Sequence, residues 1–192
     1  MPQPPPIDET STFSSPREKR LWLASLATIG AIFATLLSSS ILADAWYNQN
    51  LSAIAFLFCM ALVGLTVMTQ GLNVKAKGVE LGVGLGIAAV YFMVFFRLTI
   101  PERSHLIEYS VLTVFIYEAV VERKSHGRKM PIPAILAVLA ASLVGAIDEF
   151  IQLFLPTRVF DWTDILFNFL ASMTAAVSVS TLRFIRRFFS TQ

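Results

Sequence analysis

Long apolar runs alternate with short polar connections along almost the whole chain. Six runs stand out, at residues 21–43, 51–70, 79–100, 106–121, 132–155 and 163–182. The hydrocarbon core of a bilayer, about 30 Å thick, takes roughly 20 apolar residues in a helix. The pattern therefore predicts an all-α, polytopic transmembrane helix bundle of about six spans. The fourth run is the weakest candidate, since it is the shortest and carries Glu108 near one end and Glu118 near the other.

Composition indicates a membrane protein, and the distribution of charge predicts how the helices are oriented in the membrane. Of the 192 residues, 55% are hydrophobic and 15% charged, and the mean hydropathy is +0.66, well above what a soluble domain needs. Short cytoplasmic connections carry the excess of Lys and Arg. With the N-terminus inside, only Arg97, Arg103 and Arg158 of the fifteen Lys and Arg fall on the outer side. We therefore expect both termini to be cytoplasmic, with a basic C-terminus at residues 186–192, and we expect membrane lipids rather than nucleic acid as partners.

The N-terminal region gives smaller expectations. Residues 1–20, with several Pro, Ser and Thr, predict a flexible cytoplasmic tail. Residues 43–45 resemble a cleavage site, but the apolar run before them is longer than the roughly 7–15 residues of a signal-peptide core, so we expect a retained anchor helix. Cys59 is the only cysteine, which excludes a disulfide within the chain and a cysteine metal site. The third run has a glycine stripe that predicts close helix packing: Gly78, Gly82 and Gly86, with Gly84 between them.

Polar residues gather in stripes at the outer ends of the last three runs. Residues three or four apart share one face of a helix, and an ionised group inside a membrane is costly unless it is paired or hydrated. We therefore expect the stripes to face one another across a polar cleft on the extracytoplasmic side. The stripes are His105, Glu108 and Tyr109 in the fourth run, Asp148 and Gln152 in the fifth, and Asp161, Asp164 and Asn168 at the sixth.

Several chemistries fit these residues. Carboxylates with an imidazole could hold a divalent cation, a desolvated carboxylate could act as an acid or base, and arginine could bind a phosphate or sugar headgroup. Structural roles compete with each of these. Asp161 could cap the last helix, Arg158 could neutralise Asp148 or Glu149, and His105 could be a plain interfacial histidine. Glu118 is expected to reach the inner headgroups.

The order and spacing of these residues resemble the VanZ-like membrane proteins. The resemblance rests on the segments 105–112, 145–152 and 156–164 together with Asn168. It divides the chain into a two-span addition at residues 21–78 and a VanZ-like helical domain at residues 79–185. Two departures from the family pattern are Ala171 and Ala175 in place of glycines, and Glu102 with Arg103 in a shifted register.

The resemblance implies a shared site and a role in the bacterial envelope. The implied site is His105, Glu108, Glu149, Gln152, Arg158, Asp161, Asp164 and Asn168, with Arg103, Tyr109 and Asp148 as secondary members. No metal ligand or cofactor is assigned from the sequence, and whether the site catalyses a reaction stays open. The family takes its name from a protein that raises resistance to teicoplanin.

Our leading hypothesis is a protein of the bacterial cytoplasmic (inner) membrane whose outer cleft binds, and in one version modifies, a lipid headgroup or lipid-linked envelope precursor. Its expected effect is on glycopeptide susceptibility. The alternative is a non-catalytic structural or assembly subunit for a membrane-protein partner, in which the same residues form a buried network that fixes helix register. An ion or proton carrier is a third class, for which the inner half supplies only Glu80 and Glu118.

Overall fold

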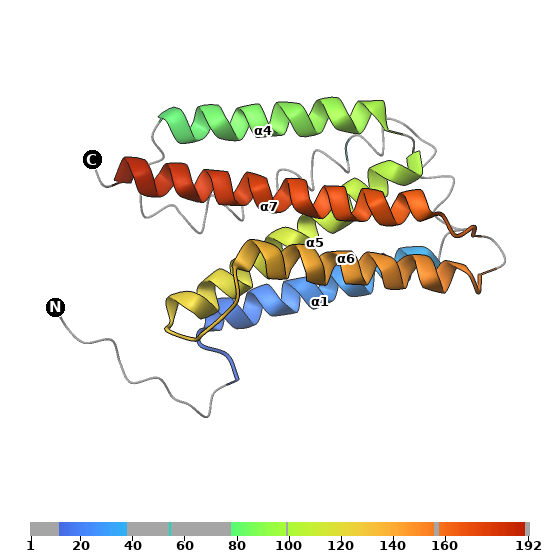
Figure 1. Ribbon diagram of the computed structural model, residues 1–192, viewed down its shortest axis with the longest axis horizontal. Helices are drawn as coiled ribbons and strands as arrows, with labels where there is room; N and C mark the ends of the chain where they lie inside the picture. Colours follow the sequence, from blue (N-terminus) through green and yellow to red (C-terminus); the bar gives the residue numbers. More distant parts are fainter. Residues whose placement is uncertain (1–11, 38–53, 55–77, 99, 156–157, 191–192) are drawn as a thin grey trace.

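The computed structural model describes residues 12–37, 54, 78–98, 100–155 and 158–190 and shows a bundle of long helices (Figure 1). The helices are α1 (Pro16–Leu37), α4 (Gly78–Arg97), α5 (Ile100–Ser125), α6 (Pro133–Gln152) and α7 (Trp162–Ser190). The described ranges contain no strand, so the predicted all-α class is confirmed. The predicted span at residues 51–70, Cys59, and the small residues 43–45 lie outside the described residues, apart from residue 54.

α1, α4, α6 and α7 lie roughly along one axis, and α5 crosses them at an angle (Figure 1). In Figure 1, α1, α4 and α6 run one way, and α5 and α7 run the other way. We call the end where α1, α4 and α6 finish and α5 and α7 begin the motif end. The opposite end, where α1 begins and α7 finishes, is called the basic end. The two ends hold different polar chemistry.

Four of the described helices are long and apolar enough to cross a membrane, over Pro16–Leu36, Glu102–Ser125, Pro133–Gln152 and Trp162–Phe188, and Gly82–Arg97 is a shorter apolar helix. The weakest predicted span turns out to be the central one. α5 packs against α1, α6 and α7, and 67% of its apolar window is buried, against 22–33% for the other three. A central helix faces protein rather than lipid, so it tolerates glutamates that would be costly on a lipid-facing helix.

α6 shows how the bundle divides its surfaces. Its buried face carries small and polar side chains, Ala137, Ala141, Gly145, Asp148, Glu149 and Gln152. Its exposed face carries large apolar ones, Ile135, Leu139, Leu143, Ile147 and Phe150. Small residues inside and large apolar residues outside are typical of helices packed in a bilayer. Ala171 and Ala175 of α7 are likewise buried, so they keep the small-residue face expected of them.

One boundary and one packing prediction change. α1 begins at Pro16, so residues 16–20 are helical rather than tail. The start resembles a capping box: Glu18 N–H donates to Ser15 Oγ (3.0 Å), and Glu18 Oε2 accepts from the N–H of Ser14, one residue before the N-cap (2.6 Å). The glycine stripe of α4 does not make the expected close approach to described parts of the chain, because a Cβ at Gly82, Gly84 or Gly86 would meet nothing within 4 Å.

Candidate functional site

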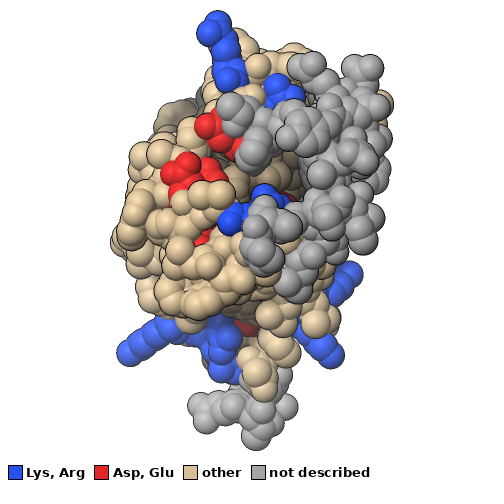
Figure 2. Space-filling view, turned by 90° about the vertical axis from the view of Figure 1, so that its right-hand side faces the viewer, with Lys and Arg blue, Asp and Glu red and all other residues tan. Residues whose placement is uncertain are grey.

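The motif end brings together members of each of the three polar stripes that the sequence predicted. Figure 2 looks on to this end and shows Asp and Glu side chains at separate points of the surface, among uncharged residues and some Lys or Arg side chains. Below that surface, His105 of α5 and Asp148 and Glu149 of α6 are all buried, and each offers a ligand-type atom within 4.8 Å of the other two. The first turn of α5 and the last turn of α6 therefore form the centre of the candidate site.

His105 and Asp148 each have one of their two polar side-chain atoms in contact with a neighbouring residue. His105 Nε2 lies 3.6 Å from Asp164 Oδ2 of α7, and its ring stacks on Tyr109 with 5.9 Å between centroids. The Tyr109 hydroxyl donates to Asp148 Oδ2 over 3.1 Å. His105 and Tyr109 are four residues apart on α5, so one helix face positions both the imidazole and the carboxylate that Tyr109 holds.

Glu149 anchors the connection between α6 and α7. Its side chain has no exposed area, and its two oxygens accept from Gln152 Nε2 (2.8 Å) and from the backbone N–H of Asp161 (3.3 Å). Asp161 in turn caps α7, because its Oδ1 accepts from the N–H of Thr163 over 2.8 Å. The hydrogen bonds from Thr163 hold the pKa of Asp161 below its ordinary value. Asp161 therefore has a structural role at the entrance of α7.

Asn168 lies deeper, against the small-residue face of α6. It is fully buried, and the position of a Cβ on Gly145 would be 2.8 Å from its Cβ and from its Nδ2. Within the described part of the chain, neither amide atom of Asn168 has a hydrogen-bond partner, and the same is true of His105 Nδ1 and Asp148 Oδ1. Buried polar atoms are nearly always paired, so these four atoms mark a place with unused binding capacity.

Three predicted site residues point elsewhere. Glu108 faces α1, where its Oε1 lies 3.4 Å from Thr35 Oγ1. Arg103 is buried against the end of α4: its Nε donates to the carbonyls of Phe95 and Leu98, and its guanidinium lies over the Phe95 ring. Arg158 is exposed, and in the described ranges no ion pair joins it to Asp148 or Glu149. In the described ranges these two arginines therefore make no direct ion pair with Asp148 or Glu149, although the charge of Arg158 acts on Asp148 from a distance.

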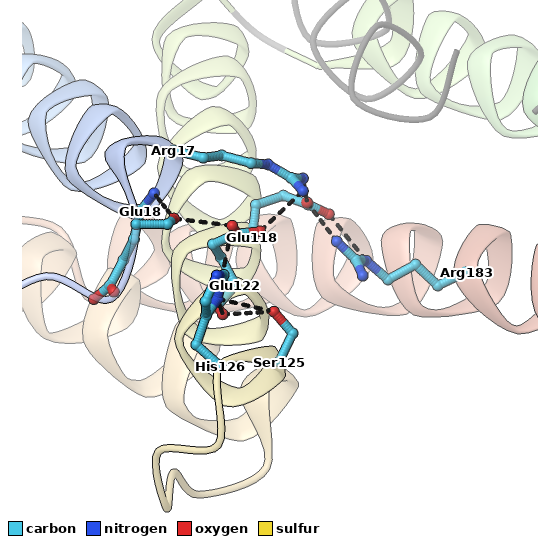
Figure 3. A network of polar contacts seen from close by, with 8 residues as sticks. Arg17, Glu18, Glu118, Glu122, Ser125, His126 and Arg183 are labelled. Atoms are coloured by element: carbon cyan, nitrogen blue, oxygen red, sulfur yellow. Dashed lines mark hydrogen bonds and ion pairs between the residues drawn. The ribbon is translucent and has the colours of Figure 1, made fainter. Parts of the chain in front are cut away.

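The basic end holds a second polar network, which the sequence analysis missed (Figure 3). Glu118 was expected to reach the inner headgroups, but it is buried and paired on both sides. It binds both Nε (3.0 Å) and Nη2 of Arg183 on α7, and it accepts from Arg17 Nη2 of α1 (3.1 Å). Glu118 therefore ties α5 to α1 and α7.

The same network closes around the start of α1. Arg17 Nη1 also pairs with Glu122 Oε2 (2.9 Å), and Glu18, which has no exposed area, pairs with Arg123 Nη1 (3.2 Å). The sequence did carry a signal for this end. Ser15 and Glu18 have the spacing of a capping box, and Glu118 and Glu122 lie one helical turn apart on a helix that also carries Arg123.

The two ends thus differ in how their buried charges are compensated. At the basic end each of Glu18, Glu118 and Glu122 has an arginine partner. At the motif end, Asp148 and Glu149 have only neutral donors among the described residues, with His105 beside them. A carboxylate pair with an imidazole and unpartnered polar atoms can bind a cation or a polar ligand.

Comparison with known proteins names the family. The sequence model of the VanZ/LLP1 family matches residues 2–183, nearly the whole chain. The matched range includes residues 21–78, so the likeness is not confined to residues 79–185. No curated protein and no solved structure matches the chain. With its spanning helices and this match, the chain belongs to the VanZ-like family of membrane proteins.

Proposed function

We propose that the chain binds the polar headgroup of a membrane lipid or lipid-linked envelope precursor at the motif end. The observation that carries the proposal is the set of buried polar atoms without a partner in the described part of the chain, on His105, Asp148 and Asn168. They lie at the end of a bundle whose outer faces are apolar. A lipid can therefore lie along the bundle and place its headgroup at these atoms.

The contrast between the two ends favours a ligand site over a register-fixing network. A network that fixes helix register should satisfy its own charges, because an unpaired buried charge is destabilising. The basic end meets this condition and is the better candidate for such a structural role. The motif end does not meet it within the described residues.

The described helices give little support to an ion or proton path. Thr113 and Ser172 are buried between the two ends, and their hydroxyls donate to backbone carbonyls of their own helices. These hydroxyls are therefore already occupied by internal hydrogen bonds.

The proposal includes six spans, with both termini in the cytoplasm and the motif end outside, in the bacterial inner membrane. Alternating spans require the first, third and fifth to be parallel and the fourth and sixth to run against them. The directions of α1, α4 and α6 against α5 and α7 agree with this order (Figure 1). The arginines of the basic end then lie on the cytoplasmic side, as the distribution of basic residues requires.

An effect on teicoplanin-type susceptibility follows from the proposed ligand. A protein that binds an envelope lipid or precursor changes the amount of that molecule that is free to bind a glycopeptide. The proposal is limited to binding, and a chemical reaction is not part of it.

The test is lipid identification on the purified chain, combined with a susceptibility measurement. Native mass spectrometry should find a co-purifying phosphate-bearing lipid on the wild type and lose it from Glu149→Gln and Asn168→Ala. The same variants should lose any shift in teicoplanin susceptibility caused by expressing the wild type. Equal lipid occupancy in folded wild type and variants would refute the headgroup site, and Glu122→Gln at the basic end is the matched control.

A further inference from the structure

We propose that His105, Asp148 and Glu149 form a binding site for a divalent transition-metal ion of the Zn²⁺ or Mn²⁺ class. Their ligand-type atoms lie within 4.8 Å of one another, and all three residues are buried. Donors around one zinc ion stand about 2.1 Å from the metal and so about 3.4 Å from one another. Small side-chain rotations would therefore bring the three donors to coordination distance.

The unpartnered atoms at this site include an imidazole nitrogen and a carboxylate oxygen, which are both metal-ligand atoms. His105 Nδ1 and Asp148 Oδ1 have no hydrogen-bond partner within the described ranges. The other ring nitrogen and the other carboxylate oxygen are held, by Asp164 and Tyr109 respectively. A histidine ligand usually has its second ring nitrogen oriented by a carboxylate, and a carboxylate ligand is itself hydrogen-bonded. Both of these outer contacts are present.

Glu149 is supported in the same way. Gln152 and the backbone N–H of Asp161 fix its two oxygens, and each oxygen keeps a second lone pair for a metal. The three candidate ligands are thus oriented by contacts that lie outside the triad.

Charge balance also calls for a cation. Two carboxylates lie buried beside one imidazole, and Arg103 is turned towards α4. Arg158 is exposed and acts on Asp148 only from a distance, without an ion pair in the described ranges. Asn168 of α7 is fully buried and lies one helical turn after Asp164, against Gly145 of α6. It adds two amide atoms that have no partner among the described residues. A divalent ion would neutralise the carboxylates without an arginine.

The donor set selects the class of metal. Imidazole suits Zn²⁺ and carboxylates suit Mn²⁺ as well as zinc, whereas Ca²⁺ and Mg²⁺ prefer oxygen ligands alone. Three protein ligands leave at least one coordination position open. A phosphate of the proposed headgroup fits that position. This last step rests on the proposed function, but the metal site itself does not.

The experiment is a metal titration of the purified full chain in detergent after treatment with a chelator. Calorimetry with Zn²⁺ and with Mn²⁺ should show one ion per chain for at least one of the two metals. His105→Asn, Asp148→Asn and Glu149→Gln should each weaken that binding tenfold or more. The same metal should raise the melting temperature of the wild type and not that of His105→Asn.

The second histidine provides a matched control. His126 lies beside Glu122 at the basic end, so an adventitious surface site would form there. His126→Asn should leave the affinity unchanged. Absence of binding to the folded wild type, or binding that survives His105→Asn and is lost in His126→Asn, would overturn the proposal. If one variant fails to fold, the other two still decide.

The metal site and the headgroup site can fail separately. Lipid that stays bound after chelation, with no metal binding to the wild type, would end the metal proposal alone. Tight metal binding that depends on the triad, with no lipid on the protein, would end the headgroup proposal alone.

Discussion

At the scale of single residues, the sequence identified most of the groups that meet at the motif end but not their partners. Spacing of three and four placed His105 with Tyr109 on one face and Asp161 with Asp164 on another. His105 does meet Asp164, and Tyr109 meets Asp148, whereas Asp161 caps the start of α7. Spacing alone could not show that Arg103 turns to the carbonyls of α4. Nor could it show that Asn168 packs on Gly145, because such contacts depend on how helices cross.

Gly145 is predicted to be indispensable for the position of Asn168. In Gly145→Ala the new Cβ would stand 2.8 Å from Asn168 Cβ, so α7 must shift away. We expect a loss of about 1–3 kcal/mol of stability from overpacking, measured as a lower melting temperature in detergent. Gly84→Ala is the control, since its Cβ meets nothing within 4 Å in the described part of the chain. Equal melting temperatures for the two variants would contradict the packing account.

At the scale of elements, hydropathy located the helices. It scored a lipid-facing helix higher than a helix in the centre of the bundle, so it did not show which helix is central. The run at 106–121 was the weakest span in the sequence and is the middle of α5, the most buried of the four candidate spans. Its glutamates lower the hydropathy of the run because they are charged. The helix tolerates them because they face protein rather than lipid. Glu118, for example, pairs with arginines of α1 and α7. A single sequence does not reveal which charges will find partners on distant helices.

The start of α7 is predicted to depend on the side chain of Asp161. Asp161→Ala should lower the melting temperature at neutral pH, and Asp161→Asn should not, because asparagine caps equally well. The folded pKa of Asp161 is lowered, so the cap stabilises the fold above the unfolded pKa of about 3.9. The charge-dependent part of this stabilisation is lost as the pH falls through the folded value, while the carbonyl oxygen of the protonated side chain can still accept a hydrogen bond, as that of asparagine does. Thermal melts against pH should therefore show the gap between the wild type and Asp161→Ala narrowing in acid, and a gap that stays unchanged would contradict the assignment.

At the scale of the whole molecule, the buried carboxylates of the basic end pair with arginines, whereas those of the motif end have neutral donors and several unpartnered polar atoms beside them. Among the described residues of the basic end, Ser14 Oγ is also unpartnered. The sequence predicted a single polar region, on the outer side, because its outer stripes were dense. The basic end was missed because Arg17, Glu118 and Arg183 are far apart in the chain. Helix directions agree with the predicted alternation of spans (Figure 1), so the two ends are expected to face opposite sides of the membrane.

The orientation is testable by cysteine labelling in a Cys59→Ala background. Val159 is 84% exposed at the motif end, and His126 is exposed at the basic end. On intact cells whose outer membrane has been made permeable, a membrane-impermeant maleimide should label Val159→Cys. His126→Cys should be labelled only after the inner membrane is opened. The reverse order of labelling would show that the proposed topology is inverted.

The central claim is that the motif end is built for a ligand and the basic end for stability. The most direct measurement is the melting temperature of two matched variants in the same detergent, Glu118→Gln and Glu149→Gln, after metal and lipid have been removed so that ligand binding does not add to stability. Glu118→Gln should cost about 2–3 kcal/mol, less than a fully buried pair because Arg17 and Arg183 stay partly exposed. Glu149→Gln removes a buried charge that has only neutral donors, so its melting temperature should equal or exceed that of the wild type. A loss in Glu149→Gln as large as that in Glu118→Gln would contradict the claim.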